Sequence, residues 1–131
     1  RWAHTAIGGF DEELLWGEDN DYAFRLWLQL GLTPEWVEEA VVHYRYRTTL
    51  RDLRSQANHY SQGLAALVLR YADYWPQPPR PRSAPERAAR AALRLMLVRN
   101  RSDLAVWNWH LGAAEGYASG LRIDVASRLE N

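Results

Sequence analysis

Apolar residues recur at every third or fourth position over two stretches of the chain, and this spacing predicts amphipathic helices. In the longer stretch, residues 49–75, the repeat consists of Leu50, Leu53, Ala57, Tyr60, Leu64, Leu67 and Tyr71. The other stretch is residues 21–30, where large apolar side chains on several faces indicate a largely buried helix. Gly31 is the expected C-cap of this second helix, and Asp19 or Asn20 is its expected N-cap.

The segment between these two helices predicts short strands. Residues 34–38 are one candidate, and residues 40–47, AVVHYRYR, alternate in their second half as a strand does. Such alternation places successive side chains on opposite faces. The expected fold class is therefore α+β, mainly helical, with few short strands.

A proline-rich segment divides the chain. Five of the six prolines fall within residues 76–86. Proline removes a backbone donor and fixes the backbone, so neither a helix nor a central strand is expected to continue through this segment. We therefore predict a stiff linker here.

The part beyond the linker is predicted to be helical. Residues 88–98 have Ala, Leu and Met on one side and arginines on the other. This arginine stripe consists of Arg87, Arg90, Arg94 and Arg101. It has three interpretations: a solvated helix face, a contact with an anionic membrane surface or lipid-linked acceptor, or a partner interface. The last segment, residues 102–125, is predicted to be a helix that is interrupted or ends near Gly112 and Gly116.

Composition narrows the classes of function. The 131 residues suffice for one domain, and 16 basic residues balance 16 acidic ones, which gives no general attraction for nucleic acid. Cysteine is absent, so any metal needs oxygen or imidazole ligands. The absence of cysteine is also consistent with a reducing compartment. The longest apolar run, residues 64–69, is far shorter than the ~20 residues that span a bilayer. We expect a cytoplasmic protein, soluble or peripheral to a membrane.

Three carboxylates lie within four positions just before the helix of residues 21–30: Glu18, Asp19 and Asp21. Carboxylates this close repel one another, so such a cluster usually meets a cation, a helix N-terminus or a proton-transfer task. In a structural interpretation, Asp19 and Asp21 cap the helix and Glu18 is solvated. In a chemical interpretation, the cluster belongs to an active site.

Several motifs follow one another in order around this cluster. Residues 8–12 read Gly-Gly-Phe-Asp-Glu, residues 18–21 read Glu-Asp-any-Asp, Arg25 and Gly31 lie in and after the helix, and His43 follows. This order and spacing resemble the second half of the catalytic domain of family 2 glycosyltransferases, which have the GT-A fold. Because the motifs occur in sequence at matching separations, the set is far more specific than any single member.

The resemblance implies an arrangement of domains. Residues 1–75 are expected to be the acceptor-side, C-terminal half of a GT-A-type domain. Residues 76–86 are the linker, and residues 87–131 form a helical C-terminal extension. The family's nucleotide-binding half, with its alternating strands and helices, has no counterpart in the sequence, so we expect the chain to be a fragment that is inactive alone.

The resemblance also implies a reaction and roles for the acids. A sugar passes from a nucleotide-diphosphate sugar to a hydroxyl of a glycan or lipid-linked acceptor, with inversion at the anomeric carbon. Asp19 is the implied general base, a function that typically gives ~10² to 10⁴ in rate. Glu18 lies beside it, adjusting its basicity or holding the acceptor. Asp21 is a substrate-side candidate that fits better as a helix cap, and Trp16 either stacks on a sugar ring or packs internally.

Three residues of the second predicted strand complete the implied site. His43 matches the family position near the donor diphosphate and its Mn²⁺ or Mg²⁺, held mainly by the missing half, although an ordinary strand histidine is the alternative. Arg45 and Arg47 either donate to pyrophosphate oxygens or belong to a solvated strand face.

A function of another class stays open beside the enzyme. A noncatalytic helical module of transferase ancestry would bind a protein partner or an anionic membrane surface, for which the arginine stripe is suited. Loss of a covering half would also leave apolar surface on the helix of residues 21–30, so self-association is a further expectation.

Overall fold

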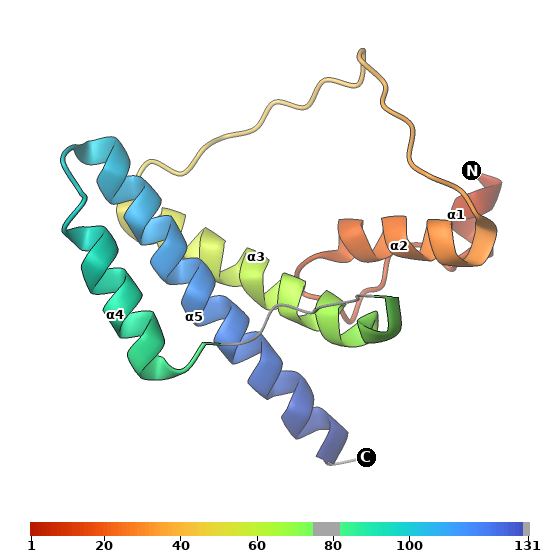
Figure 1. Cartoon of the computed structure of the whole chain (residues 1–131). Coiled ribbons are helices and arrows are strands. Elements are labelled where there is room, and N and C mark those ends of the chain that lie inside the picture. The colour runs from red at the N-terminus through yellow and green to blue at the C-terminus, as the bar shows by residue number, and fades with distance from the viewer. Residues whose placement is uncertain (75–81, 130–131) are drawn as a thin grey trace. The chain divides into compact units, whose positions relative to one another are not determined.

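The computed structural model describes residues 1–74 and 82–129, with side chains described as far as Arg122, and this part of the chain is mainly helical (Figure 1). The elements are α1 (Trp2–Ala6), α2 (Glu18–Leu30), α3 (Leu50–Arg70), the 3₁₀ turn η1 (Ala72–Tyr74), α4 (Ala84–Leu95) and α5 (Arg101–Leu129). The chain divides into two compact units, an N-terminal unit (Arg1–Tyr46) and a C-terminal unit (Arg47–Asn131). The mainly helical character predicted from the sequence is confirmed.

The two predicted strands are absent from the described residues. Residues 32–49, which include both of them, are irregular in backbone and exposed throughout. A strand is stable only when a neighbouring strand satisfies its backbone donors and acceptors, and the described part of the chain contains no second strand. The prediction of strands at residues 34–38 and 40–47 is therefore wrong for this structure, because alternation alone supplies no partner.

Helix α2 begins earlier than predicted and is capped differently. Its N-cap is Gly17, whose φ of 84° is left-handed, and Glu18 is already in the first turn. The predicted N-caps, Asp19 and Asn20, are thus wrong by two and three residues. The acids of the first turn instead face the positive end of the helix dipole, which stabilises their charge. Gly31 ends the helix with φ 65°, as predicted.

Helix α3 follows the predicted apolar repeat closely. Thr49 is its N-cap, and the threonine hydroxyl accepts a hydrogen bond from the backbone amide of Asp52. The helix buries Ala57, Gly63, Ala65, Leu67 and Val68. These side chains form most of the core of the C-terminal unit, in which α3 packs along α5. The helix thus packs on the part that follows the predicted linker, although the sequence grouped it with residues 1–75.

Three buried glycines of α5 bring the two long helices together: Gly112, Gly116 and Gly120, spaced four residues apart. A Cβ atom on Gly116 would lie 1.9 Å from the carbonyl oxygen of Asn58, and one on Gly112 would lie 2.2 Å from that of Arg54. The backbones therefore approach more closely than any side chain permits. The predicted interruption of α5 is wrong, because this close packing offsets the ~1 kcal/mol that each glycine costs in a helix.

Gly116→Ala is expected to destabilise the C-terminal unit by about 1–3 kcal/mol, because the new methyl group would overlap the α3 backbone. In a solvated helix the same change is stabilising by ~1 kcal/mol. Thermal unfolding followed by helical circular dichroism measures the difference. An increase in Tm would show that α3 and α5 do not pack at this position.

Helix α4 begins inside the predicted linker. Ser83 is the N-cap and forms a capping box with Glu86, while Pro85 occupies the first turn, where its missing amide donor is not needed. The first turn of α4 therefore overlaps the C-terminal end of the predicted linker, and residues 75–81 lie outside the described part. The indole Nε1 of Trp107 donates to the backbone carbonyl of Ala91 over 2.8 Å and ties α5 to α4.

None of the described helices combines the length and apolar character needed to span a membrane.

Candidate active site

One arginine fastens the double-glycine turn of the N-terminal unit to α2. Arg25 donates from Nε to Asp21 Oδ2, from one terminal nitrogen to the carbonyl of Ile7 and from the other to that of Gly9, each over 2.7 Å. We call this set of three hydrogen bonds the Arg25 clamp. Asp21 is fully buried beneath it. Charge-assisted hydrogen bonds of this length are strong, so the turn is held firmly against the helix.

Aromatic side chains hold the same turn from its other side. Phe10 stacks on Tyr22 of α2 with ring centroids 4.6 Å apart, and His4 lies 5.7 Å from Tyr22. Gly8 and Gly9 have φ of 79° and 77°, a conformation that glycine adopts without strain. The backbone before residues 11–17 is therefore fixed by packing, and the backbone after them by the start of α2.

Two exposed acids lie at the start of α2, the helix against which the double-glycine turn is held. Asp19 and Glu18 lie in the exposed first turn of α2, after Trp16, which is 38% exposed. Asp19 Oδ1 accepts hydrogen bonds from the backbone amide of Asn20 over 2.8 Å and from its side-chain nitrogen over 3.0 Å. This orienting contact was not predicted from the sequence. An exposed, oriented carboxylate on a firmly held helix can accept a proton from a bound hydroxyl.

Asp21 has a different environment from Asp19, two positions away. It is 0% exposed and forms an ion pair with Arg25, one helical turn further on. The spacing of four residues is a sequence signal for this pair. The carboxylate pairs with the arginine that holds the turn, and no part of it is exposed to solvent in this structure.

Three predicted site residues lie in the irregular segment, and all of them are exposed. Within the described residues of the N-terminal unit, neither His43 nor Arg45 forms a hydrogen bond or ion pair with Glu18 or Asp19, and Arg47 belongs to the C-terminal unit. The described side chains contain no group of three or more His, Asp or Glu that could hold a metal ion. A lone imidazole is too little for Mn²⁺ or Mg²⁺, so these residues do not fit a metal site by themselves.

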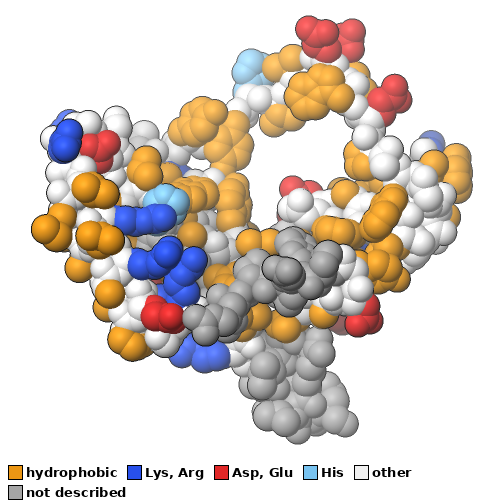
Figure 2. Space-filling view, in the orientation of Figure 1, with side chains coloured by type: hydrophobic (Ala, Val, Ile, Leu, Met, Phe, Trp, Pro, Cys, Tyr) orange, Lys and Arg blue, Asp and Glu red, His pale blue; other side chains and the backbone are white. Residues whose placement is uncertain are grey.

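The predicted arginine stripe is divided between two helices. Arg87, Arg90 and Arg94 lie in α4, whereas Arg101 is the first residue of α5. The prediction that these four arginines share one helical face is wrong, because α4 ends at Leu95. Figure 2 shows arginine side chains gathered beside a histidine over α4 and α5.

Comparison with known proteins supports a relationship to glycosyltransferases. The chain is 36% identical over 67 residues to the pre-mycofactocin glycosyltransferase of two strains of Mycobacterium tuberculosis. The similar region covers 51% of this chain but only 14% of the length of that relative. No family model matches the chain, and no solved structure matches it significantly. The relationship therefore rests on part of each chain.

Proposed function

We propose that the chain is the acceptor-side part of an inverting, family 2-like glycosyltransferase of GT-A fold, in which Asp19 is the general base. The observation that carries the proposal is the contrast between two acids of one helical turn. Asp21 is buried and holds the frame, whereas Asp19 is exposed and oriented. The similarity to a mycobacterial glycosyltransferase supports the reaction class.

The proposed chemical step uses the free side of the Asp19 carboxylate. Oδ1 is held by Asn20, and Oδ2 accepts no hydrogen bond from the described residues. Oδ2 takes the proton of the acceptor hydroxyl while that oxygen bonds to the anomeric carbon and the nucleotide diphosphate leaves from the opposite face. The carbon is thereby inverted. A positioned base is needed because a neutral alcohol is a weak nucleophile.

Two neighbours complete the proposed acceptor side. Trp16 precedes the helix and is partly exposed, and we assign its ring to stacking against a sugar. Glu18 is exposed in the same turn and holds an acceptor hydroxyl.

Donor binding is assigned to sequence beyond these 131 residues, because the chain spans only about one-seventh of its relative's length (14%). The irregular segment supports this assignment. Its apolar side chains are exposed, with Trp36 at 89%, Val42 at 83% and Tyr46 at 80%. We propose that it becomes a strand when it pairs with that other part, which would bring His43 and its neighbouring arginines to the donor diphosphate.

The 131-residue chain alone is expected to bind no nucleotide-sugar in the micromolar range, because the proposal places the base and ribose contacts elsewhere. Calorimetry with UDP-, GDP- and dTDP-sugars and Mn²⁺ measures this directly. A protein of the relative's full length serves as the control and is expected to bind one of these sugars. Micromolar binding by the short chain would overturn the assignment.

A second function is favoured by one separate observation. Apolar side chains are exposed where α4 ends, with Leu93 at 63%, Met96 at 82% and Leu97 at 64%. A noncatalytic module could bind a protein partner or a membrane surface there. In that case substitution of Asp19 leaves partner binding unchanged, and the full-length protein transfers no sugar.

A further inference from the structure

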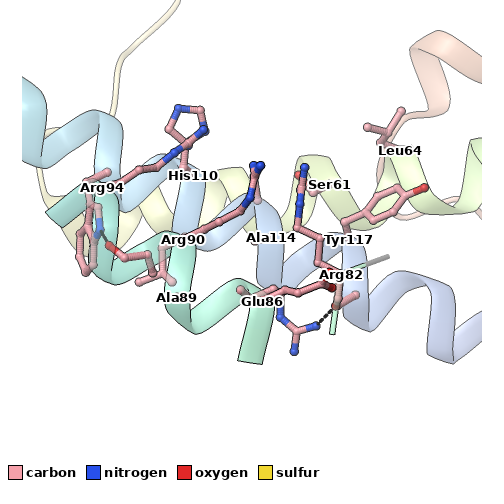
Figure 3. A pocket seen from close by; sticks show the side chains of 16 residues that line it. Ser61, Leu64, Arg82, Glu86, Ala89, Arg90, Arg94, His110, Ala114 and Tyr117 are labelled. Atoms are coloured by element: carbon pink, nitrogen blue, oxygen red, sulfur yellow. Dashed lines mark hydrogen bonds between the residues drawn. The ribbon is translucent and has the colours of Figure 1, made fainter. Parts of the chain in front are cut away.

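The C-terminal unit contains a cavity that the proposed transfer reaction does not use. It lies between α4 and the α3–α5 pair and has a volume of about 800 Å³ (Figure 3). This is within the range of sites that hold small molecules. The acidic cluster of α2 contributes no residue to it.

One side of this cavity is strongly cationic. Arg82, Arg90 and Arg94 line it together with Arg87, and Glu86 is the single carboxylate among the described residues of the lining. That carboxylate accepts from the backbone amide of Ser83 in the capping box. No carboxylate of the described residues forms an ion pair with Arg82, Arg90 or Arg94. Guanidinium groups gathered in this way attract an anion, and they pair especially well with phosphate oxygens.

The surroundings of His110 agree with this charge. His110 is an exposed residue whose imidazole is partly desolvated by its neighbours. This desolvation lowers the pKa of His110, and the positive charge of Arg94 lowers it further. In Figure 3, Arg94 extends from α4 toward this imidazole. A neutral imidazole next to a guanidinium can still donate a hydrogen bond to an anion without a proton being taken up.

Small apolar residues of α5 also line the cavity, among the arginines. Ala113, Ala114 and Ala118 leave space that Leu64 of α3 and Leu111 of α5 border. An inorganic anion would fill only the cationic end. A hydrocarbon body attached to the anion would also cover the alanine surface, which is favourable by about 25 cal/mol per Å² of apolar area buried.

We propose that this cavity binds a single-chain amphiphile with a phosphate head group, the phosphate on Arg90 and Arg94 and the hydrocarbon against Ala114. The site is independent of the proposed glycosyl transfer. It belongs to the C-terminal unit alone, and either assignment can fail without the other.

Calorimetry of the 131-residue chain with octyl phosphate, below its micelle concentration, tests the proposal. We expect saturable one-to-one binding, together with shifts of the His110 ring protons in NMR spectra. Octyl glucoside has the same chain without charge, and inorganic phosphate has the charge without the chain. Both are expected to bind at least tenfold more weakly. Equal binding of either control would overturn the proposal, as would binding of phosphatidylglycerol vesicles without binding of monomeric octyl phosphate.

Two variants test the two ends of the cavity separately. Arg90→Gln removes one guanidinium and is expected to weaken octyl phosphate binding at least tenfold. Ala114→Leu keeps every charge but fills the apolar end, and a similar loss is expected. Arg99→Gln is the matched control, since Arg99 is exposed and does not line the cavity. Unchanged binding by a folded Arg90→Gln or Ala114→Leu variant, or equal loss by Arg99→Gln, would contradict the site.

Discussion

Asp19→Asn in the full-length enzyme is expected to lower kcat by about 10²-fold or more, because asparagine cannot take the acceptor's proton. The side chain keeps its size and its oxygen toward Asn20, and the position is exposed, so folding is expected to be unaffected. Steady-state assays with radiolabelled donor sugar measure the effect. The loss should appear in kcat and in kcat/KM alike, because the proton is transferred only in the transition state.

Glu13→Gln is the matched control for this variant. Glu13 is an exposed acid in the preceding loop, and the substitution removes the same charge. Its turnover is expected to stay within a factor of two or so of the parent, since distant surface charges contribute little after screening. Equal losses in both variants would mean that Asp19 acts through overall charge and not as a base.

Arg25→Met is expected to weaken the N-terminal unit by about 3 kcal/mol, because it removes the guanidinium that forms an ion pair with the fully buried carboxylate of Asp21. Two carbonyl groups of the double-glycine turn lose their donor at the same time. Hydrogen exchange of the α2 amides reports this local loss as protection reduced by roughly 10²-fold. Amides of α3, in the other unit, provide an internal reference.

Arg45→Met is the matched substitution at an exposed arginine of the same unit, and it is expected to change α2 protection little. Asp21→Asn distinguishes the two interpretations of that acid. A helix cap tolerates asparagine well, whereas a buried partner of Arg25 does not. Full protection of α2 in both Arg25→Met and Asp21→Asn would contradict the clamp.

The features that were predicted correctly from the sequence depend on residues that are close together along the chain. The left-handed Gly31 and the repeat within α3 follow from local rules, and the structure has both. The continuity of α5 could not be predicted in this way. A glycine that breaks an isolated helix allows close packing when a second backbone lies against it, and Asn58, which supplies that backbone at Gly116, is 58 residues earlier.

In the candidate site, too, local features were predicted from the sequence and features that depend on distant residues were not. Order and spacing of motifs indicated the acidic cluster and the helix that carries it. They did not distinguish the exposed Asp19 from the buried Asp21. Asp21 pairs with Arg25, whose other two partners are the carbonyls of Ile7 and Gly9, 18 and 16 residues before it. The prediction of a strand around His43 was wrong for a related reason. Alternation indicates which side chains would share a face of a strand, but it does not indicate whether a partner strand is present.

A single-turnover measurement on the full-length enzyme tests the role of Asp19 most directly. Labelled donor sugar is bound first, its affinity is measured, and acceptor is then mixed in and the reaction quenched. The account predicts that Asp19→Asn binds donor as the parent does and forms product about 10²-fold more slowly. Product formation at the parent rate with donor fully bound would remove Asp19 as the base.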